Sequence, residues 1–151
     1  MTRYRNSQPG WVMTAGSIIG GALLLMPVFS FRTASETKPL LLLSAFFVFA
    51  MLLLFHSLTA IVTDTHLKVY FGNGIIRRTI LLEDIEHCIA EKNQMVFGWG
   101  IRLGPGYVLW NVSGFDSVEL TLKNKPRRFR IGTDRPRELC DAIINAISSK
   151  Q

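Results

Sequence analysis

The sequence predicts a membrane-inserted helical hairpin followed by a small domain of short strands that ends in one helix. Two uncharged apolar runs, 11–31 and 39–58, stand close together near the N-terminus. From Thr63 onward, apolar and polar residues alternate, as they do in half-buried strands. Near the C-terminus the apolar residues return to helical spacing.

The first part of the chain divides into a tail, two spans and a link. Residues 1–10 are polar, end in Pro-Gly and are predicted to form a short flexible cytoplasmic tail. A helix needs roughly 20 apolar residues to cross a hydrocarbon core about 30 Å thick, and both 11–31 and 39–58 are of this order. The link 32–38 is then a short external loop, and 59–151 forms a domain on the same side as the N-terminus.

The apolar runs have two other interpretations. Each run could be a buried core helix, although a small soluble domain seldom holds two uncharged runs of this length. The first run could also be a signal peptide, because Arg3 and Arg5 precede it. It is long for that role, and the second run would still stop transfer and leave the C-terminal part in place.

Small residues recur along one face of the first run. Gly16 and Gly20 stand four apart, as do Ser17 and Gly21. This spacing lets two membrane helices approach closely. The second run offers a matching set of small residues, so packing within the hairpin is expected rather than a dedicated dimer contact.

The distribution of charge predicts the orientation of the hairpin. Basic residues near the chain ends are Arg3, Arg5, Lys68, Arg77 and Arg78, against Arg32 and Lys38 in the link. Because Lys and Arg accumulate in cytoplasmic segments, both termini of this multi-pass chain are predicted to lie in the cytoplasm, at the plasma (inner) membrane. The cysteines, Cys88 and Cys140, are too few for a disulfide framework, as expected in a reducing compartment.

The segment after Thr63 reads as a series of strands. Leu67, Val69 and Phe71 alternate with polar or amphipathic residues, and 72–74 then predicts a tight hairpin turn. Further strands are predicted at 75–82, 85–92, 117–122 and 127–133. The segment 93–114 is rich in glycine and is predicted to be irregular, with a turn at Pro105-Gly106.

A C-terminal helix is predicted after the last strand. Asp134 can cap it, and Pro136 suits its first turn. Its apolar stripe consists of Leu139, Ile143, Ala146 and Ile147. One helix laid across so small a set of strands would cover an open edge and an unfilled end.

Four segments resemble a known family. They are 63–72 (TDTHLKVYFG), 97–102 (FGWGIR), 110–114 (WNVSG) and 128–134 (RFRIGTD), and they look like bacterial pleckstrin-homology-like (PH-like) membrane proteins with an N-terminal two-helix hairpin. The resemblance implies a mainly-β split barrel capped by a C-terminal helix, and it implies no catalytic residues. Lys68, Arg77 and Arg78 flank the first turn, but their spacing departs from that of phosphoinositide-binding PH domains.

Catalytic and metal-binding patterns are weak in this sequence. His56, His66 and His87 are dispersed, and none stands at metal-ligand spacing from a Cys, Asp or Glu. The glycine-rich segments lack the strand–loop–helix setting and the Lys of a phosphate loop. We therefore expect no enzyme activity, no cofactor and no metal.

A basic run near the C-terminus suggests contact with anionic lipid headgroups. It consists of Lys123, Lys125, Arg127, Arg128 and Arg130. Each Lys or Arg near an anionic surface contributes roughly 1 kcal/mol. The alternative is an ordinary solvated hairpin. Nucleic acid is not expected, because Phe129 would point away from the neighbouring arginines.

The Gly- and Trp-rich segment 97–114 suggests a protein contact. Trp, Tyr and Arg dominate contact hot spots, so Trp99, Arg102 and Tyr107 are the predicted partner-binding residues. The alternative is that the segment packs internally, with Trp99 and Trp110 in the core. The expected function is a PH-like binding or scaffolding domain held at the membrane for a protein partner. Anionic-lipid sensing through the basic run 123–130 is the second expectation.

Overall fold

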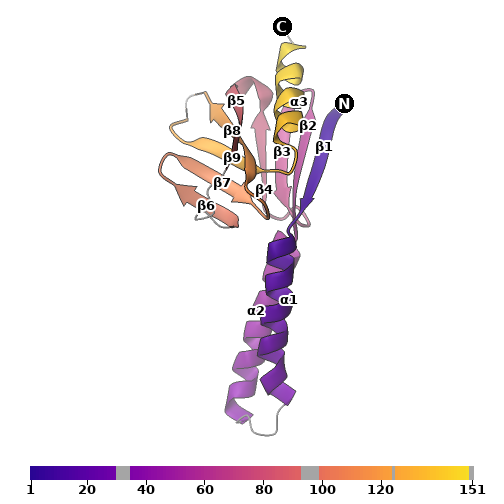
Figure 1. Ribbon diagram of the computed structural model, residues 1–151, viewed down its shortest axis with the longest axis vertical. Coiled ribbons are helices and arrows are strands. Elements are labelled where there is room, and N and C mark those ends of the chain that lie inside the picture. The colour runs from indigo at the N-terminus through magenta and orange to yellow at the C-terminus, as the bar shows by residue number, and fades with distance from the viewer. Residues whose placement is uncertain (30–34, 93–98, 124, 150–151) are drawn as a thin grey trace.

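The computed structural model describes residues 1–29, 35–92, 99–123 and 125–149, which form a β-rich domain and a helical hairpin projecting from it (Figure 1). The helices are α1 (Trp11–Leu25), α2 (Lys38–Phe55) and α3 (Pro136–Ser148), with short 3-10 turns η1 (Met26–Phe29), η2 (Ser35–Thr37) and η3 (Leu82–Asp84). The segments 11–29 and 35–55 are long and apolar enough to cross a membrane, and their side chains are almost entirely outside the core.

The second helix ends earlier than the sequence predicted. α2 stops at Phe55, and the chain continues directly into strand β2 (Ser57–Thr63). Leu58, predicted as the last residue of the span, is instead buried in the core of the β domain. The two helices contact each other, but a Cβ atom added at Gly16 or Gly20 would meet no atom within 4 Å. Those two glycines therefore do not form the predicted packing groove.

The first sheet contains four antiparallel strands in the order β1-β2-β3-β4. Besides β2, they are β1 (Thr2–Pro9), β3 (His66–Phe71) and β4 (Arg77–Leu81). The turn between β3 and β4 is longer than the predicted two-residue hairpin. The Gly74 N–H donates to the Phe71 carbonyl at 2.8 Å, and Phe71 N–H donates to the Ile76 carbonyl at 2.9 Å.

The N-terminal segment is not a flexible tail. β1 pairs along its length with β2, from Thr2 opposite Thr63 to Pro9 opposite Ser57. Its inward-facing side chains are Tyr4, Asn6 and Gln8, so the strand buries mostly polar groups. Two of them donate hydrogen bonds: Asn6 Nδ2 donates to Asp134 Oδ1 at 2.6 Å, and Gln8 Nε2 donates to the Ser113 carbonyl at 2.9 Å. This polarity explains why no strand was predicted there.

The second sheet contains five strands in the order β5-β8-β9-β7-β6. They are β5 (Ile85–Lys92), β6 (Gly100–Gly104), β7 (Tyr107–Asn111), β8 (Asp116–Leu122) and β9 (Arg128–Gly132). All pairs are antiparallel except β7 with β9. Most of the segment predicted as irregular is thus a hairpin that turns at Pro105-Gly106, while 93–98 lies outside the described residues.

The two sheets pack against each other without closing into a barrel in the described part of the chain. α3 packs against β1 and β2 of one sheet and β5 and β8 of the other. Its buried face carries Leu139, Ile143 and Ala146, as predicted. Asp134 is not its cap, because Arg135 occupies that position and the Asp134 carboxylate accepts from Asn6.

Two cysteines that are distant in sequence meet under α3. The thiols of Cys88 on β5 and Cys140 on α3 are close enough to affect each other's pKa. Burial raises the pKa of both thiols, so both are held in the protonated form. They belong to the packing between helix and sheet, with neither thiol in a disulfide.

The helical hairpin joins the β domain without a linker. The Gly10 N–H donates to the His56 carbonyl at 2.7 Å, and the Gly72 N–H donates to the Ser57 carbonyl at 2.8 Å. A Cβ atom at Gly72 would lie 2.6 Å from the Leu53 carbonyl oxygen, and Gly72 has a φ of +43°. A side chain there is excluded twice, by the end of α2 and by backbone strain.

Gly72→Ala is expected to destabilise the protein by about 2–4 kcal/mol, because it adds a clash with α2 to the cost of a positive φ. Gly74→Ala is the matched control. Gly74 also has a positive φ, +82°, but its added Cβ would meet nothing closer than 3.7 Å. It should cost about 1 kcal/mol. Thermal unfolding of the purified protein in detergent measures both, and equal losses would contradict the tight junction.

Candidate functional site

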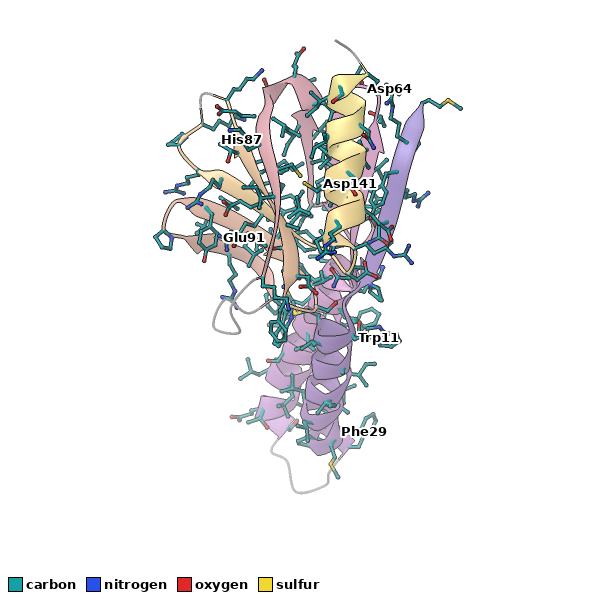
Figure 2. All side chains as sticks on the ribbon, turned by 45° about the horizontal axis from the view of Figure 1, so that its top comes forward. Trp11, Phe29, Asp64, His87, Glu91 and Asp141 are labelled. Carbon is teal, nitrogen blue, oxygen red and sulfur yellow. The ribbon has the colours of Figure 1, made fainter. Side chains whose placement is uncertain are left out.

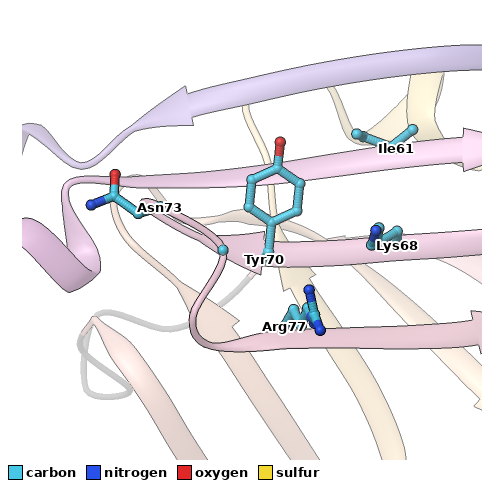
Figure 3. Close-up of a pocket in the computed structure, with 6 residues that line it drawn as sticks. Ile61, Lys68, Tyr70, Asn73 and Arg77 are labelled. Atoms are coloured by element: carbon cyan, nitrogen blue, oxygen red, sulfur yellow. The ribbon is translucent and has the colours of Figure 1, made fainter.

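A shallow hollow on the outer face of the first sheet is a candidate site. Its volume is about 300 Å³. The lining residues are Ile61, Lys68, Tyr70, Asn73, Gly74 and Arg77. Figure 3 shows the Lys68 and Arg77 side chains lying on the same side of the sheet, near the Tyr70 ring.

The strand register explains this grouping. Lys68 and Tyr70 are two apart on β3, so their side chains leave the same face of the sheet. Tyr70 lies opposite Arg77 of β4, and Lys68 lies opposite Ile61 of β2. Opposite residues of antiparallel strands share a face, so three strands deliver these four side chains to one surface.

The two basic groups of the hollow have no acidic neighbour. Among the described residues, neither Lys68 nor Arg77 has a carboxylate within 4.0 Å. Arg78 behaves differently because it lies on the opposite face of β4. Its guanidinium lies 4.3 Å from the centre of the Phe129 ring, and burial lowers its pKa.

The hollow lies close to the end of the helical hairpin. Asn73 and Gly74 belong to the β3–β4 turn, and Gly72 of the same turn contacts the last turn of α2. Figure 3 shows Asn73 at the end of the hollow nearest the helix. A guanidinium, an ammonium, a phenol and an amide around one hollow can donate several hydrogen bonds to an oxyanion. The arrangement is therefore suited to a phosphate-like group.

The basic run predicted to bind lipid occupies a different place. Lys123, Lys125 and Arg127 are exposed at the turn between β8 and β9. β9 runs parallel to β7. The C-terminal end of β7 is followed by Val112, which lies close to Gly10 at the start of α1. The β8–β9 turn is consequently at the opposite end of these strands from the helical hairpin (Figure 1).

The two arginines of the same run are engaged in an ion-pair network. Glu119 lies between them: Arg128 Nη1 is 2.7 Å from Glu119 Oε1, and Arg130 Nε is 2.6 Å from Oε2. The side chains of Glu119 and Arg130 are only 7% and 12% exposed, against 49% for Arg128. Arg130 also lies 4.5 Å from the centre of the Tyr107 ring. This network neutralises part of the charge that the sequence assigned to lipid contact.

The predicted protein-contact residues are divided between surface and interior. Arg102 is exposed on the edge strand β6, and Trp99, just before it, is partly buried. Tyr107 is buried beneath Arg130, so it does not share an accessible surface with Arg102. Trp110 is in the core, where its ring lies 5.0 Å from Phe71 and 5.5 Å from Phe129. Tyr107 and Trp110 are thus both buried.

The sequence places Lys68 and Arg77 on either side of the first turn, but it does not predict that they line one site. The available signal was the alternation along β3 combined with the position of the turn. The turn is longer than predicted, but Tyr70 still lies opposite Arg77, as it would with a two-residue turn at Asn73-Gly74. No three His, Cys, Asp or Glu side chains gather as a metal site among the described residues.

Comparison with known proteins adds no family assignment. The chain matches no protein-family model and no curated protein.

Glu119→Gln is expected to lower the free energy of unfolding by about 2 kcal/mol, because it removes the nearer carboxylate, at 2.6 Å, from the buried Arg130 guanidinium and leaves it only Glu91, at 3.4 Å. Glu138→Gln is the matched control. Glu138 pairs with Arg135 at 3.3 Å, but both side chains are largely exposed. That pair should contribute less than about 1 kcal/mol. Thermal unfolding in detergent compares the two variants, and an equal effect would show that the Glu119 network is not structurally important.

Proposed function

We propose that this protein is a membrane-anchored binding module, rather than an enzyme, that recognises anionic lipid headgroups at the surface of its own bilayer. The observation that carries the proposal is the hollow with Lys68 and Arg77. Its two basic groups face one surface without a carboxylate within 4.0 Å among the described residues, and the hollow begins beside the end of α2.

The proposal includes the location of the domain. α1 and α2 would span the plasma (inner) membrane of a bacterium and leave the β domain in the cytoplasm. Both ends of the hairpin enter the first sheet, through β1 and β2, so the N-terminal strand and the domain lie on one side. An anionic cytoplasmic leaflet attracts each nearby Lys or Arg by roughly 1 kcal/mol. A PH-like relationship is supported by two packed sheets followed by one C-terminal helix, although the open sheets and the parallel β7–β9 pair depart from the expected split barrel.

Short-chain phosphatidylglycerol is expected to raise the melting temperature of the detergent-purified full-length protein by several degrees. A ligand at 100 times its dissociation constant stabilises the folded state by about 2.7 kcal/mol. Short-chain phosphatidylcholine should have no such effect. The variant K68Q/R77Q should lose the response, and added salt should weaken it because the contact is electrostatic.

The variant K123Q/K125Q is the matched control, because it also removes two positive charges, but from the β8–β9 turn. It should respond to phosphatidylglycerol as the unchanged protein does. If K123Q/K125Q alone loses the response, the site is the basic run and not the hollow. If no variant differs from the unchanged protein, the proposal is wrong. Glycerol phosphate, tested in the same way, separates recognition of a lipid from recognition of a free phosphate group.

A second candidate function, binding of a protein partner, is favoured by strand β6. It is an edge strand of the second sheet, and its exposed side chains are Ile101, Arg102 and Leu103. An edge strand offers backbone N–H and C=O groups to an extended segment of another protein. Apolar side chains on such an edge would add contact area, and Arg102 would add an ionic contact.

The double variant W99A/R102A is expected to abolish a stoichiometric association seen after mild detergent extraction of tagged full-length protein. These side chains flank the start of the edge, and Trp and Arg residues typically dominate protein contacts. K123Q/K125Q serves as the control, because it alters a distant exposed turn. An association that survives W99A/R102A with an unchanged melting temperature would place the partner site elsewhere.

A further inference from the structure

Three large apolar side chains are exposed where the helical hairpin meets the β domain. Trp11 begins α1, Ile75 lies in the β3–β4 turn, and Phe115 lies in the β7–β8 loop. They are 72%, 75% and 41% exposed. Figure 2 shows Trp11 at the level where the helices enter the domain, with Phe29 at the far end of the hairpin. We refer to Trp11, Ile75 and Phe115 as the three junction side chains.

The turn that carries Ile75 rests against the end of α2. The Gly72 N–H bonds the Ser57 carbonyl at 2.8 Å, just after the helix. A Cβ atom at Gly72 would lie 2.6 Å from the Leu53 carbonyl oxygen and 2.7 Å from that of Leu54. The turn therefore cannot move away from the helix without breaking a backbone hydrogen bond. Ile76 packs on the core, while Ile75 points into solvent.

The loop that carries Phe115 rests against the start of α1. The Ser113 hydroxyl donates to the Pro9 carbonyl at 2.8 Å, and the buried Gln8 amide donates to the Ser113 carbonyl at 2.9 Å. A Cβ atom at Gly10 would lie 3.2 Å from Val112 Cβ. Two hydrogen bonds and the close approach of Gly10 to Val112 thus hold this loop beside the point where the chain enters α1.

A scatter of single exposed apolar residues is normal on a soluble surface. The three junction side chains differ because they lie beside the domain ends of the two apolar helices, where Val12 of α1 and Leu53 of α2 are also exposed. Tryptophan in particular is enriched where membrane helices leave the hydrocarbon core. Continuity with the apolar surface of the hairpin identifies the occupant of this surface as the same bilayer.

We propose that Trp11, Ile75 and Phe115 insert into the interfacial layer of the membrane and dock the β domain on it. Each side chain comes from a different segment, and each segment is fixed to the junction by hydrogen bonds or backbone contacts. Three such insertions fix the tilt of the domain relative to the bilayer, which the two helices alone do not. This inference rests on the proposed insertion of the hairpin, but not on the lipid specificity of the hollow.

The test measures the depth of labelled positions in full-length protein reconstituted into phosphatidylcholine vesicles. In a background with Cys88→Ala and Cys140→Ala, a single cysteine replaces Ile75 or Phe115 and carries a small fluorophore. Lipids with a spin label just below the headgroup quench fluorophores in the interfacial layer. Leu81→Cys is the matched control, because Leu81 is an exposed apolar residue at the opposite end of β4.

Phe47→Cys, within α2, reports on insertion of the hairpin itself. Positions 75 and 115 are expected to lose at least half of their fluorescence with the shallow quencher, and position 81 is expected to keep nearly all of it. Quenching at 47 without quenching at 75 and 115 would overturn the docking inference and leave the spans intact. Absence of quenching at 47 with a quencher near the bilayer centre would overturn both. Because these vesicles lack anionic lipid, the result is independent of the proposed headgroup recognition.

Discussion

The backbone pairing of β1 with β2 is the interaction on which the rest of the structure depends. These strands belong to the first sheet, and the two apolar helices leave from their adjacent ends, so the helical hairpin is an insertion within a β-hairpin. The hydrogen bond from Gly10 to His56 continues the ladder to the helix ends. A domain tied to a hairpin by two paired strands cannot turn freely, as it could on a single flexible linker. Every surface of the domain therefore has a defined distance from the hairpin.

Apolar patterning predicted the parts of the fold that are apolar. The two helices, the strands β3, β8 and β9 and the buried face of α3 follow directly from length and periodicity. β1 was not predicted because its inward-facing residues include Asn6 and Gln8, whose side-chain amides donate hydrogen bonds instead of making apolar contacts. The β6–β7 hairpin escaped because its glycines read as loop, although Gly104 lies opposite Tyr107 and leaves room for that ring. Such close approaches depend on tertiary contacts that no local pattern contains.

The candidate site shows the same limit for charge. The run 123–130 holds many basic residues, and on composition alone it is a conspicuous concentration of positive charge. In the fold, Glu119 forms ion pairs with two arginines of this run. The other basic residues of the run lie at the end of the strands that is remote from the hairpin. Lys68 and Arg77 are nine positions apart in sequence and become neighbours only through the register of two strands. The sign and density of the charge could be read from the sequence. The ion pairs with Glu119 and the distance of the basic run from the hairpin, which decide what the charge can contact, could not.

The insertion of the hairpin between β1 and β2 also constrains the order of events during synthesis. When β1 leaves the ribosome its partner does not yet exist, because both apolar helices must be made first. If the hairpin spans a membrane as proposed, the polar β1 segment stays unpaired on the side where β2 later emerges, and the sheet is completed only after the hairpin has been inserted. Proteolytic removal of the first apolar run, as happens to a secretory leader, would therefore take away an edge strand of the folded domain together with the helix. On the proposed membrane insertion of α1 and α2, insertion and folding of the β domain are successive steps of one process.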